Sequence, residues 1–404
     1  MYLRPSWRPG FLLPLVVIIA FVTDVTLRLL PVEGLAFRPW EAVRRYRPAS
    51  DAFEPNQHFY KEHSYGVLAA LGNMPERRQY RAESFTTDAY GYRNLPEVAE
   101  AAAAGRVEAM LVGSSMATGV GNNDDETLAV QLTRRTGRVV YNASLTFDLH
   151  SLERIRSVAG RLGLGCSPPA ACPPARPGLV IFEYLESYDL PDTRDTGVRE
   201  PCFRLVMLAG WRQFDPLCTA AHGLARVSPL RIFAERSFQQ LQDDRVLPNV
   251  RGGAVVQGTL QNGEVMLFSP VDVAQFRDTA VRPTRPAALY LSQLAAELRR
   301  DELQLLVVLL PGAYTVYSGL LAEPVPPPAP GTSYFERLEG ELRAAGVPVV
   351  NLTAPFVAGA ERDLAQGEYI YWRDDHHWNR RGIALGAEEV AKAWDRLREG
   401  GTLG

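Results

Sequence analysis

The stretch that decides the fold is Val107-Glu-Ala-Met-Leu-Val-Gly-Ser-Ser-Met-Ala-Thr-Gly119, an apolar run that ends in a Gly/Ser turn. The run predicts a buried strand, and Asp124 or Asp125 is expected to cap the helix that follows. Ligands of an open α/β sheet bind beyond the carboxyl ends of its strands, so Ser115 lies where a ligand would bind. A Gly/Ser turn alone is a weak signal of catalysis, because most such turns are only turns.

Four more apolar runs alternate with amphipathic segments, which is the pattern of a parallel sheet covered by helices. The five predicted strands are residues 107–112, 138–142, 178–184, 303–310 and 347–352. The predicted helices are residues 126–135, 151–162, 287–300, 334–345 and 382–398. We therefore expect a doubly wound α/β domain over residues 106–404. Residues 190–285 break the rhythm and are interpreted as an insertion, helical first and then a hairpin that turns at 261–264.

The N-terminal 31 residues resemble a membrane-targeting segment. Arg4 and Arg8 precede an apolar run over residues 11–23, and continuing to Leu30 gives about 20 residues, near the length of a bilayer span. We expect an uncleaved signal anchor that keeps its positive flank in the cytoplasm and exports the rest of the chain. A cleaved signal peptide and a buried core helix are the alternatives. Residues 32–105 are expected to form a lead-in segment packed on the domain.

Composition narrows the class of protein. Hydrophobic residues make up 46% and charged residues 22% of the 404 residues, which is typical of a globular protein. With 43 basic and 46 acidic side chains the net charge is −3, so nucleic acid is not an expected partner. The four cysteines suit two disulfides, Cys166 with Cys172 and Cys202 with Cys218, or four free thiols.

A second polar stretch, Tyr371-Trp-Arg-Asp-Asp-His-His-Trp-Asn379, comes just before the last predicted helix. An aspartate within three residues of a histidine can hold the imidazole while its other nitrogen takes a proton from a nucleophile. Loops at the carboxyl ends of a parallel sheet converge, so this loop and Ser115 form a possible Ser-His-Asp set. A polar loop that only caps the helix is one alternative. A metal site is the other, and its ligands would be Asp374, Asp375, His376 and His377.

These two stretches resemble the SGNH/GDSL superfamily of serine esterases and acyltransferases. Residues 111–119 with Tyr141-Asn-Ala-Ser-Leu145 resemble its first two blocks, and Asp374 to Asn379 resemble its last block. The His-Trp ending, with Leu310-Pro-Gly-Ala-Tyr-Thr-Val-Tyr317, is similar to membrane-tethered proteins of bacterial exopolysaccharide O-acetylation, the alginate and cellulose type. The resemblance covers residues 85–398. It implies a three-layer α/β/α, flavodoxin-like parallel sheet.

The resemblance also implies site residues. Ser115 takes the place of the nucleophile and His377 that of the base, while Asp375 or Asp374 orients the histidine. The amides of Ser115 and Ser144 are expected to bind the oxyanion. Ser144 replaces the glycine of the second block, and Ser114 replaces the aspartate of Gly-Asp-Ser. The asparagine of the third block is not evident, and Ser187 is nearest to its position.

Neighbours of the expected base are candidates for substrate binding. His376 adjoins it, and Trp378 would stack on a sugar ring or pack in the core. The segment from Phe85 to Asn94 is expected to be a turn packed on the domain, with an approach of Arg93 to the site as the alternative.

The function implied is an exported O-acetyltransferase that acetylates polysaccharide hydroxyls through Ser115. No metal and no organic cofactor is required. The partners implied are a polysaccharide acceptor and a polytopic membrane acyltransferase that delivers the acyl group. The protein would sit in the bacterial inner membrane by a single pass, with its catalytic domain in the periplasm or outside the cell. A carbohydrate acetyl esterase and a catalytically silent polysaccharide-binding or scaffold module are the alternatives.

Overall fold

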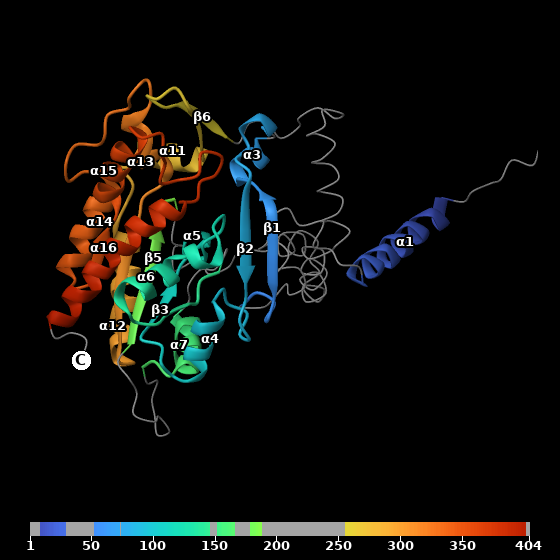
Figure 1. Ribbon diagram of the computed structural model, residues 1–404, viewed down its shortest axis with the longest axis horizontal. Helices are drawn as coiled ribbons and strands as arrows, with labels where there is room; N and C mark the ends of the chain where they lie inside the picture. Colours follow the sequence, from blue (N-terminus) through green and yellow to red (C-terminus); the bar gives the residue numbers. More distant parts are fainter. Residues whose placement is uncertain are drawn as a thin grey trace, which may run out of the picture.

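The structure is a computed structural model that describes residues 9–29, 52–72, 74–145, 152–165, 178–187 and 255–400. Five parallel strands form its central sheet (Figure 1). They are β3 (Ala109–Val112), β4 (Val140–Asn142), β5 (Gly178–Leu185), β8 (Leu303–Leu310) and β9 (Val349–Asn351). Their order is β4-β3-β5-β8-β9, which is the flavodoxin-like order 2-1-3-4-5 when these strands are counted along the chain. The prediction of a parallel α/β sheet from five apolar runs is confirmed.

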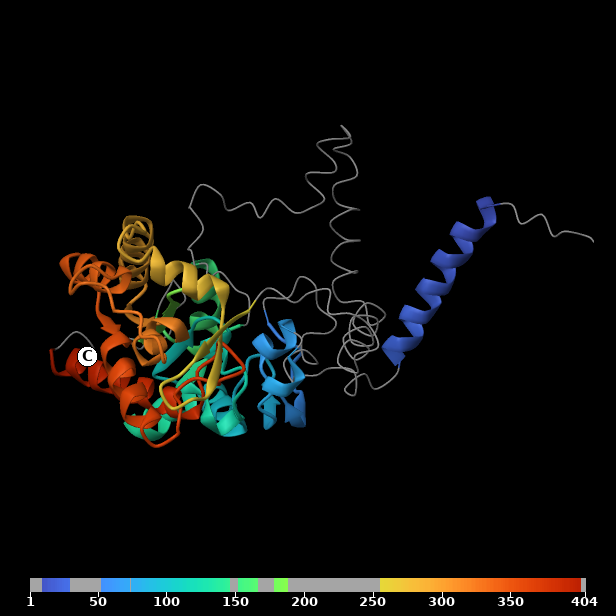
Figure 2. The ribbon, with the colours of Figure 1, turned by 90° about the horizontal axis from the view of Figure 1, so that it is seen from above.

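Helices cover both faces of this sheet. The described α-helices that pack in the domain are α4 (Pro96–Ala103), α5 (Ser115–Thr118), α6 (Leu128–Thr136), α7 (Leu152–Leu162), α11 (Pro270–Arg277), α12 (Arg285–Arg300), α13 (Ala313–Tyr317), α14 (Tyr334–Ala344), α15 (Thr353–Leu364) and α16 (Arg380–Glu399). Helices α6, α15 and α16 pack on one face, while α4, α7, α12 and α14 pack on the other. Figure 2, seen from above, shows the red α16 and the gold α12 on opposite sides of the body.

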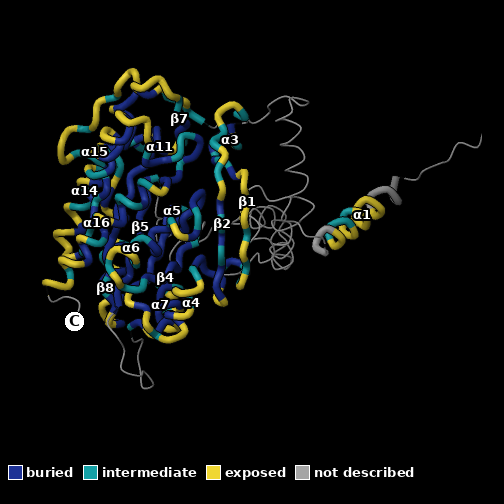
Figure 3. The backbone as a smooth tube through the Cα atoms, in the orientation of Figure 1, coloured by how far each residue is buried: buried dark blue, intermediate teal, exposed yellow. Residues whose placement is uncertain are grey.

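Alternation along the strands separates the two cores. In β8, Leu306 and Val308 join the core under α16, whereas Leu305 and Val307 join the core under α12. Since both faces are covered, the strands read as continuous apolar runs, and all eight residues of β5 are buried (Figure 3).

The lead-in segment forms an antiparallel pair of its own, β1 (His58–Ser64) with β2 (Arg81–Thr86). Short helical turns lie between and after these strands: α3 (Val67–Leu71), η2 (Pro75–Arg77) and η3 (Asp124–Glu126). The expected cap on α6 is wrong, because Thr127 holds the N-cap position and Asp124 instead binds Arg93 at 2.9 Å.

The predicted hairpin is confirmed. Strands β6 (Val256–Thr259) and β7 (Val265–Phe268) pair antiparallel, and Gly263 supplies the left-handed turn conformation at φ 84°. Helix α11 follows the hairpin. The short helix η5 (Ser318–Leu320) contacts the turn of the hairpin, where the Gln261 N–H donates to the Leu320 carbonyl oxygen. The expected helical part before the hairpin and the four cysteines lie outside the described residues.

Helix α1 (Pro9–Leu29) corresponds to the N-terminal apolar run. Of the helices in the described ranges, none combines the length and the apolar character that crossing a bilayer requires.

Candidate active site

The strand β3 ends in a turn that presents Ser115 as the first residue of α5. Glu183 on the neighbouring β5 holds this turn, because its Oε2 accepts the Ser114 N–H at 2.7 Å and the Ser114 hydroxyl at 2.8 Å. Gly113 is required here, since a Cβ would lie 2.6 Å from the same carboxyl oxygen. The turn sits between β3 and β5, where the strand order reverses and ligands of doubly wound sheets bind.

Glu183 was missed at the sequence level, although a signal was visible. It is the one charged residue in the otherwise apolar run that became β5. Burial raises the pKa of Glu183 to about 7, against hydrogen bonds from Ser114 and Ala117 that lower it. A carboxyl with this pKa is partly protonated at neutral pH.

The structure brings Ser115, His377 and Asp375 into one hydrogen-bonded chain, although 262 positions separate the serine from the histidine. His377 Nε2 lies 2.8 Å from Ser115 Oγ, and His377 Nδ1 lies 2.8 Å from Asp375 Oδ1. His377 is 3% exposed, whereas Ser115 is half-buried and reachable. This is the arrangement in which a histidine removes a proton from a serine while an aspartate fixes its tautomer.

Asp375, not Asp374, contacts the histidine. Burial raises the pKa of Asp375, but His377, His376 and Arg81 outweigh it and hold that pKa well below its usual range. Asp375 therefore carries a fixed negative charge beside the His377 Nδ1–H, which supports the protonated imidazole that forms during acyl transfer.

Residues 267–404 match the family model described as "SGNH hydrolase-like domain, acetyltransferase AlgX". The matched part runs from β7 through α16, so it contains Asp375 and His377 but not Ser115. A search of curated proteins found no match for the chain. The resemblance to SGNH acetyltransferases is therefore supported over this part of the chain, and it indicates an enzyme of the acetyltransferase type.

The lead-in segment builds one wall of this candidate site. Asp374 Oδ2 accepts the N–H groups of Gly66 at 2.7 Å and Gln79 at 2.9 Å, and Val67 N–H donates to Asp375 at 3.0 Å. Gly66 fits because it carries no Cβ, which would lie 2.0 Å from the Asp374 carbonyl oxygen. The aspartate loop is thus held by residues about 300 positions earlier in the chain.

Arg81 of β2 joins both aspartates. Its Nη1 lies 3.0 Å from Asp374 and its Nη2 lies 3.4 Å from Asp375, and its guanidinium stacks over Trp372 at 4.2 Å. Burial raises the pKa of Asp374, and Arg81 opposes that rise. Arg81 therefore compensates two adjacent buried carboxylates. No local pattern pointed to it, because its partners are distant in sequence.

The expected oxyanion donors are not all directed at Ser115. The Ser144 N–H donates to Asn142 Oδ1 at 3.0 Å, and its hydroxyl donates to the Leu111 carbonyl oxygen at 3.2 Å. Ser187 hydrogen-bonds Asp272 through its side chain and Gln275 through its carbonyl oxygen. The Ser115 N–H is the first of α5 and has no carbonyl partner four residues back in that helix. Of the three expected donors, the Ser115 N–H is the one that remains a candidate.

Of the two expected substrate-binding residues, one is excluded. Trp378 is wholly buried and its indole N–H donates to the Met116 carbonyl oxygen at 3.0 Å, so it packs under the nucleophile turn and cannot stack on a sugar. His376 is 29% exposed, and its ring lies 4.2 Å from that of His377, centroid to centroid. His376 therefore remains a candidate at the mouth of the site.

Three of the four residues proposed as metal ligands, Asp375, His376 and His377, place donor atoms within 4.8 Å of one another. His377 however uses both ring nitrogens, on Asp375 and Ser115. A metal bound there would break the serine contact, so this arrangement favours nucleophilic chemistry.

Arg93 contacts the end of α5 and the loop after it, and none of its hydrogen bonds within the described residues reaches Ser115, Asp375 or His377. It is buried and donates to the carbonyl oxygens of Gly119 and Asn122 at 2.7 Å each, besides its pair with Asp124. The segment from Phe85 to Asn94 thus packs on the domain as expected, and Arg93 holds the loop that follows α5 through these hydrogen bonds.

Proposed function

We propose that this protein is an exported serine O-acyltransferase that moves acetyl groups to polysaccharide hydroxyls. The observation that carries the proposal is the contact of 2.8 Å from His377 Nε2 to Ser115 Oγ, with Asp375 on the other ring nitrogen. The match of residues 267–404 to an acetyltransferase-type family supports acetyl as the group transferred.

In the first half-reaction Ser115 Oγ attacks the acetyl carbonyl carbon while His377 Nε2 takes the hydroxyl proton. The carbonyl oxygen becomes an oxyanion facing the Ser115 N–H. Collapse breaks the bond to the donor's leaving atom, and the imidazolium returns its proton to that atom. The products are acetyl-Ser115, neutral His377 and the deacylated donor.

In the second half-reaction a sugar hydroxyl takes the donor's place. His377 removes the hydroxyl proton as the sugar oxygen attacks acetyl-Ser115, and the proton then passes to Ser115 Oγ as the ester bond to serine breaks. The same groups thus act in both directions, and water in place of the sugar would give an esterase.

The cellular setting is part of the proposal. The basic flank at Arg4 and Arg8 and the apolar run after it support a single-pass anchor in a bacterial inner membrane. The side chains of α1 from Leu15 to Ile19 are 46–60% exposed, which leaves them available to lipid. Outside the cytoplasm acetyl-CoA is absent, so a polytopic membrane acyltransferase is the proposed acyl donor.

The test incubates the full chain in detergent with p-nitrophenyl acetate and with neutral and acidic oligosaccharides, followed by mass spectrometry of the sugars. Acetylated sugar is expected from the wild type and from Ser157→Ala, a serine on the exposed side of α7. It should vanish in Ser115→Ala and His377→Ala. Ester turnover indifferent to every sugar would favour the esterase, and no turnover at all would leave the silent binding module.

A further inference from the structure

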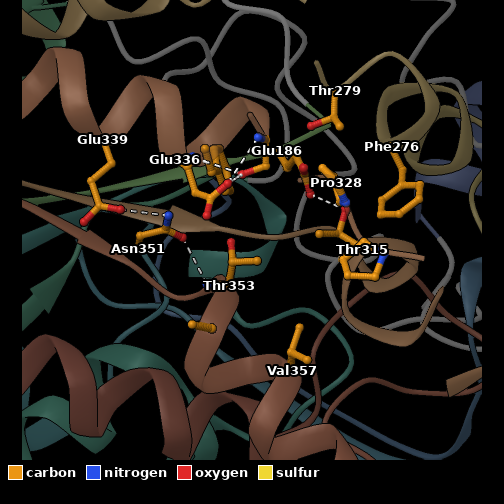
Figure 4. Close-up of a pocket in the computed structure, with 14 residues that line it drawn as sticks. Glu186, Phe276, Thr279, Thr315, Pro328, Glu336, Glu339, Asn351, Thr353 and Val357 are labelled. Atoms are coloured by element: carbon orange, nitrogen blue, oxygen red, sulfur yellow. Dashed lines mark hydrogen bonds between the residues drawn. The ribbon is translucent and has the colours of Figure 1, made fainter. Parts of the chain in front are cut away.

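A cavity of about 380 Å³ opens at the carboxyl ends of β5, β8 and β9, the same edge of the sheet that carries Ser115 (Figure 4). Its walls come from α11, α13, α14 and α15. The volume falls in the range of about 300–1,000 Å³ that is usual for small-molecule sites. The triad does not use this cavity.

Two polar groups face the cavity without full partners. Glu186 is only 5% exposed. Its Oε2 accepts the Gly312 N–H at 2.9 Å and the Thr315 hydroxyl at 2.7 Å. Its Oε1 makes no hydrogen bond among the described residues. Across the cavity the Thr353 Oγ1 is buried and likewise has no partner in the part of the chain described. Hydroxyl groups of a bound molecule would supply the missing partners of these atoms.

The remaining lining suits the ring of a sugar. Pro327 and Pro328, with the edge of Phe276, supply apolar surface against which the C–H face of a pyranose packs, and the buried Phe335 lies behind them. Asn351 lies at the rim, where its Nδ2 donates to Glu339 at 3.0 Å. Apolar walls with a few convergent polar atoms are the usual composition of such sites.

The charge of the lining selects among sugars. Glu186, Glu336 and Glu339 line the cavity, and no lysine or arginine is among its described lining residues. The nearby cations are engaged: Arg343 pairs with Glu339, and Arg282 donates to the Glu186 carbonyl oxygen. An anionic sugar such as a uronate would bring like charge into a site with no cation to receive it.

The cavity is connected to the triad through the sheet edge. Gly312, which donates to Glu186, follows Pro311, whose carbonyl oxygen accepts the Tyr371 hydroxyl at 2.6 Å. Tyr371 pairs with Trp378, the residue after the base. Strands β8 and β9 lie two and three places from β3, about 10–14 Å at the usual strand spacing. An acceptor chain that reaches both sites is therefore an oligosaccharide of several residues.

We propose that this cavity is a subsite for an uncharged sugar residue of the acceptor polysaccharide, some residues away from the hydroxyl that is acetylated. The assignment rests on the proposed acyltransferase function. It adds that the acceptor is a neutral polysaccharide and not a uronate polymer.

The test fills the cavity. Ala354 on α15 lines it and is exposed, so Ala354→Trp places an indole in the space without removing any contact. Ala358 is exposed on the same helix outside the lining, and Ala358→Trp is the matched control. Titration calorimetry on the full chain measures binding of cellohexaose, mannohexaose, galactohexaose and hexagalacturonate.

We expect at least one neutral hexasaccharide to bind the wild type and Ala358→Trp at least tenfold more tightly than hexagalacturonate does. Ala354→Trp should weaken that binding at least tenfold. Equal affinity in the two tryptophan variants, tighter binding of the uronate, or no binding of any neutral sugar would overturn the assignment.

Turnover of p-nitrophenyl acetate separates this inference from the proposed function. All three proteins should hydrolyse or transfer from this small ester equally, because the triad is untouched. Sugar binding lost only in Ala354→Trp, with no ester turnover in any protein, would refute the acyltransferase and keep the cavity as a sugar site.

Discussion

Replacing Arg81 by methionine should destabilise the protein far more than the loss of an ordinary surface ion pair does. Arg81→Met keeps the length of the stem but removes the cation that contacts Asp374 at 3.0 Å and Asp375 at 3.4 Å. The side chain of Arg81 is 8% exposed, and those of the aspartates are 0% and 1% exposed. The backbone N–H donors and His377 would remain, but the two adjacent buried carboxylates would lose the cation that they share. Breaking a buried pair in this way costs about 3–5 kcal/mol.

A matched control exists on the surface. Arg138 pairs with Asp395 at 2.8 Å and lies 5.1 Å from the ring centroid of Trp394, but the side chain of Asp395 is 54% exposed. Solvent screens this pair, so Arg138→Met should cost about 0–1 kcal/mol. Urea unfolding followed by tryptophan fluorescence gives both free energies of unfolding.

The pH dependence of Arg81→Met has a definite sign. Burial already raises the pKa of Asp374, and losing the cation raises it further. A carboxyl whose pKa is raised on folding contributes stability at low pH that is lost as the pH rises. The deficit of the variant should therefore grow as the pH is raised above about 4, the usual pKa of an aspartate.

Activity provides a second readout. Asp375 loses one of the groups that fix it, and a misplacement of about 1 Å near a reacting group costs about 10²-fold in rate. Turnover of p-nitrophenyl acetate should fall by that order in Arg81→Met and stay unchanged in Arg138→Met. A stability loss below about 1 kcal/mol, or an equal loss in the control, would refute the positioning role of Arg81.

Three further predictions follow from buried contacts. Burial raises the pKa of Glu183 from 4.5 to about 7, so the unfolding free energy of the wild type should fall by about 3 kcal/mol as the pH rises through that range. In Glu183→Gln this fall of the unfolding free energy with pH should be missing, as measured by urea titrations at several pH values. Gly66→Ala should lower ester turnover about 10²-fold, because its Cβ would meet the Asp374 carbonyl oxygen at 2.0 Å, whereas Gly340→Ala, with open space around it, should leave turnover intact. Trp378→Phe should cost about 1–3 kcal/mol of unfolding free energy, since it removes one of the two N–H donors to the Met116 carbonyl oxygen and leaves empty space where the buried indole packs. An unchanged melting temperature would contradict this.

The sheet was predictable because its strands are buried on both faces. The run that became β5 contains apolar residues at consecutive positions, so neither register nor partner was needed to find it. The predicted ends of the strands were less accurate than the strands themselves. For example, β4 begins at Val140, two residues after the predicted start. The Arg138 side chain pairs with Asp395 of α16, and the strand begins only where the buried apolar residues start.

The sequence predicted Ser115, His377 and one of two aspartates as a catalytic set, and the distances in the structure select the aspartate. Sequence spacing allowed either Asp374 or Asp375, and the His-Trp ending favoured Asp375. The position of the Asp375 carboxylate beside His377 agrees with that preference. For Trp378, packing was the preferred interpretation and sugar stacking the alternative, since both use the same residue type. Its burial under α5 decides for packing.

The contributions of the lead-in segment were beyond prediction from a single sequence. Arg81 and Gly66 act on residues about 300 positions later, and nothing in their local sequence names a partner. The Ser144 amide was assigned from its block position alone. The Asn142 side chain that accepts its N–H is set by the conformation of the folded loop.

The most direct test of the account is whether Ser115 becomes acetylated. The full chain is mixed with p-nitrophenyl acetate without acceptor, quenched in acid and mapped by peptide mass spectrometry. One acetyl group is expected on the peptide that contains Ser115. It should be absent in Ser115→Ala and His377→Ala, and the serine should return to its free form when an acceptor oligosaccharide is added. An unmodified Ser115 in the wild type, or acetylation that persists in His377→Ala, would contradict the central claim.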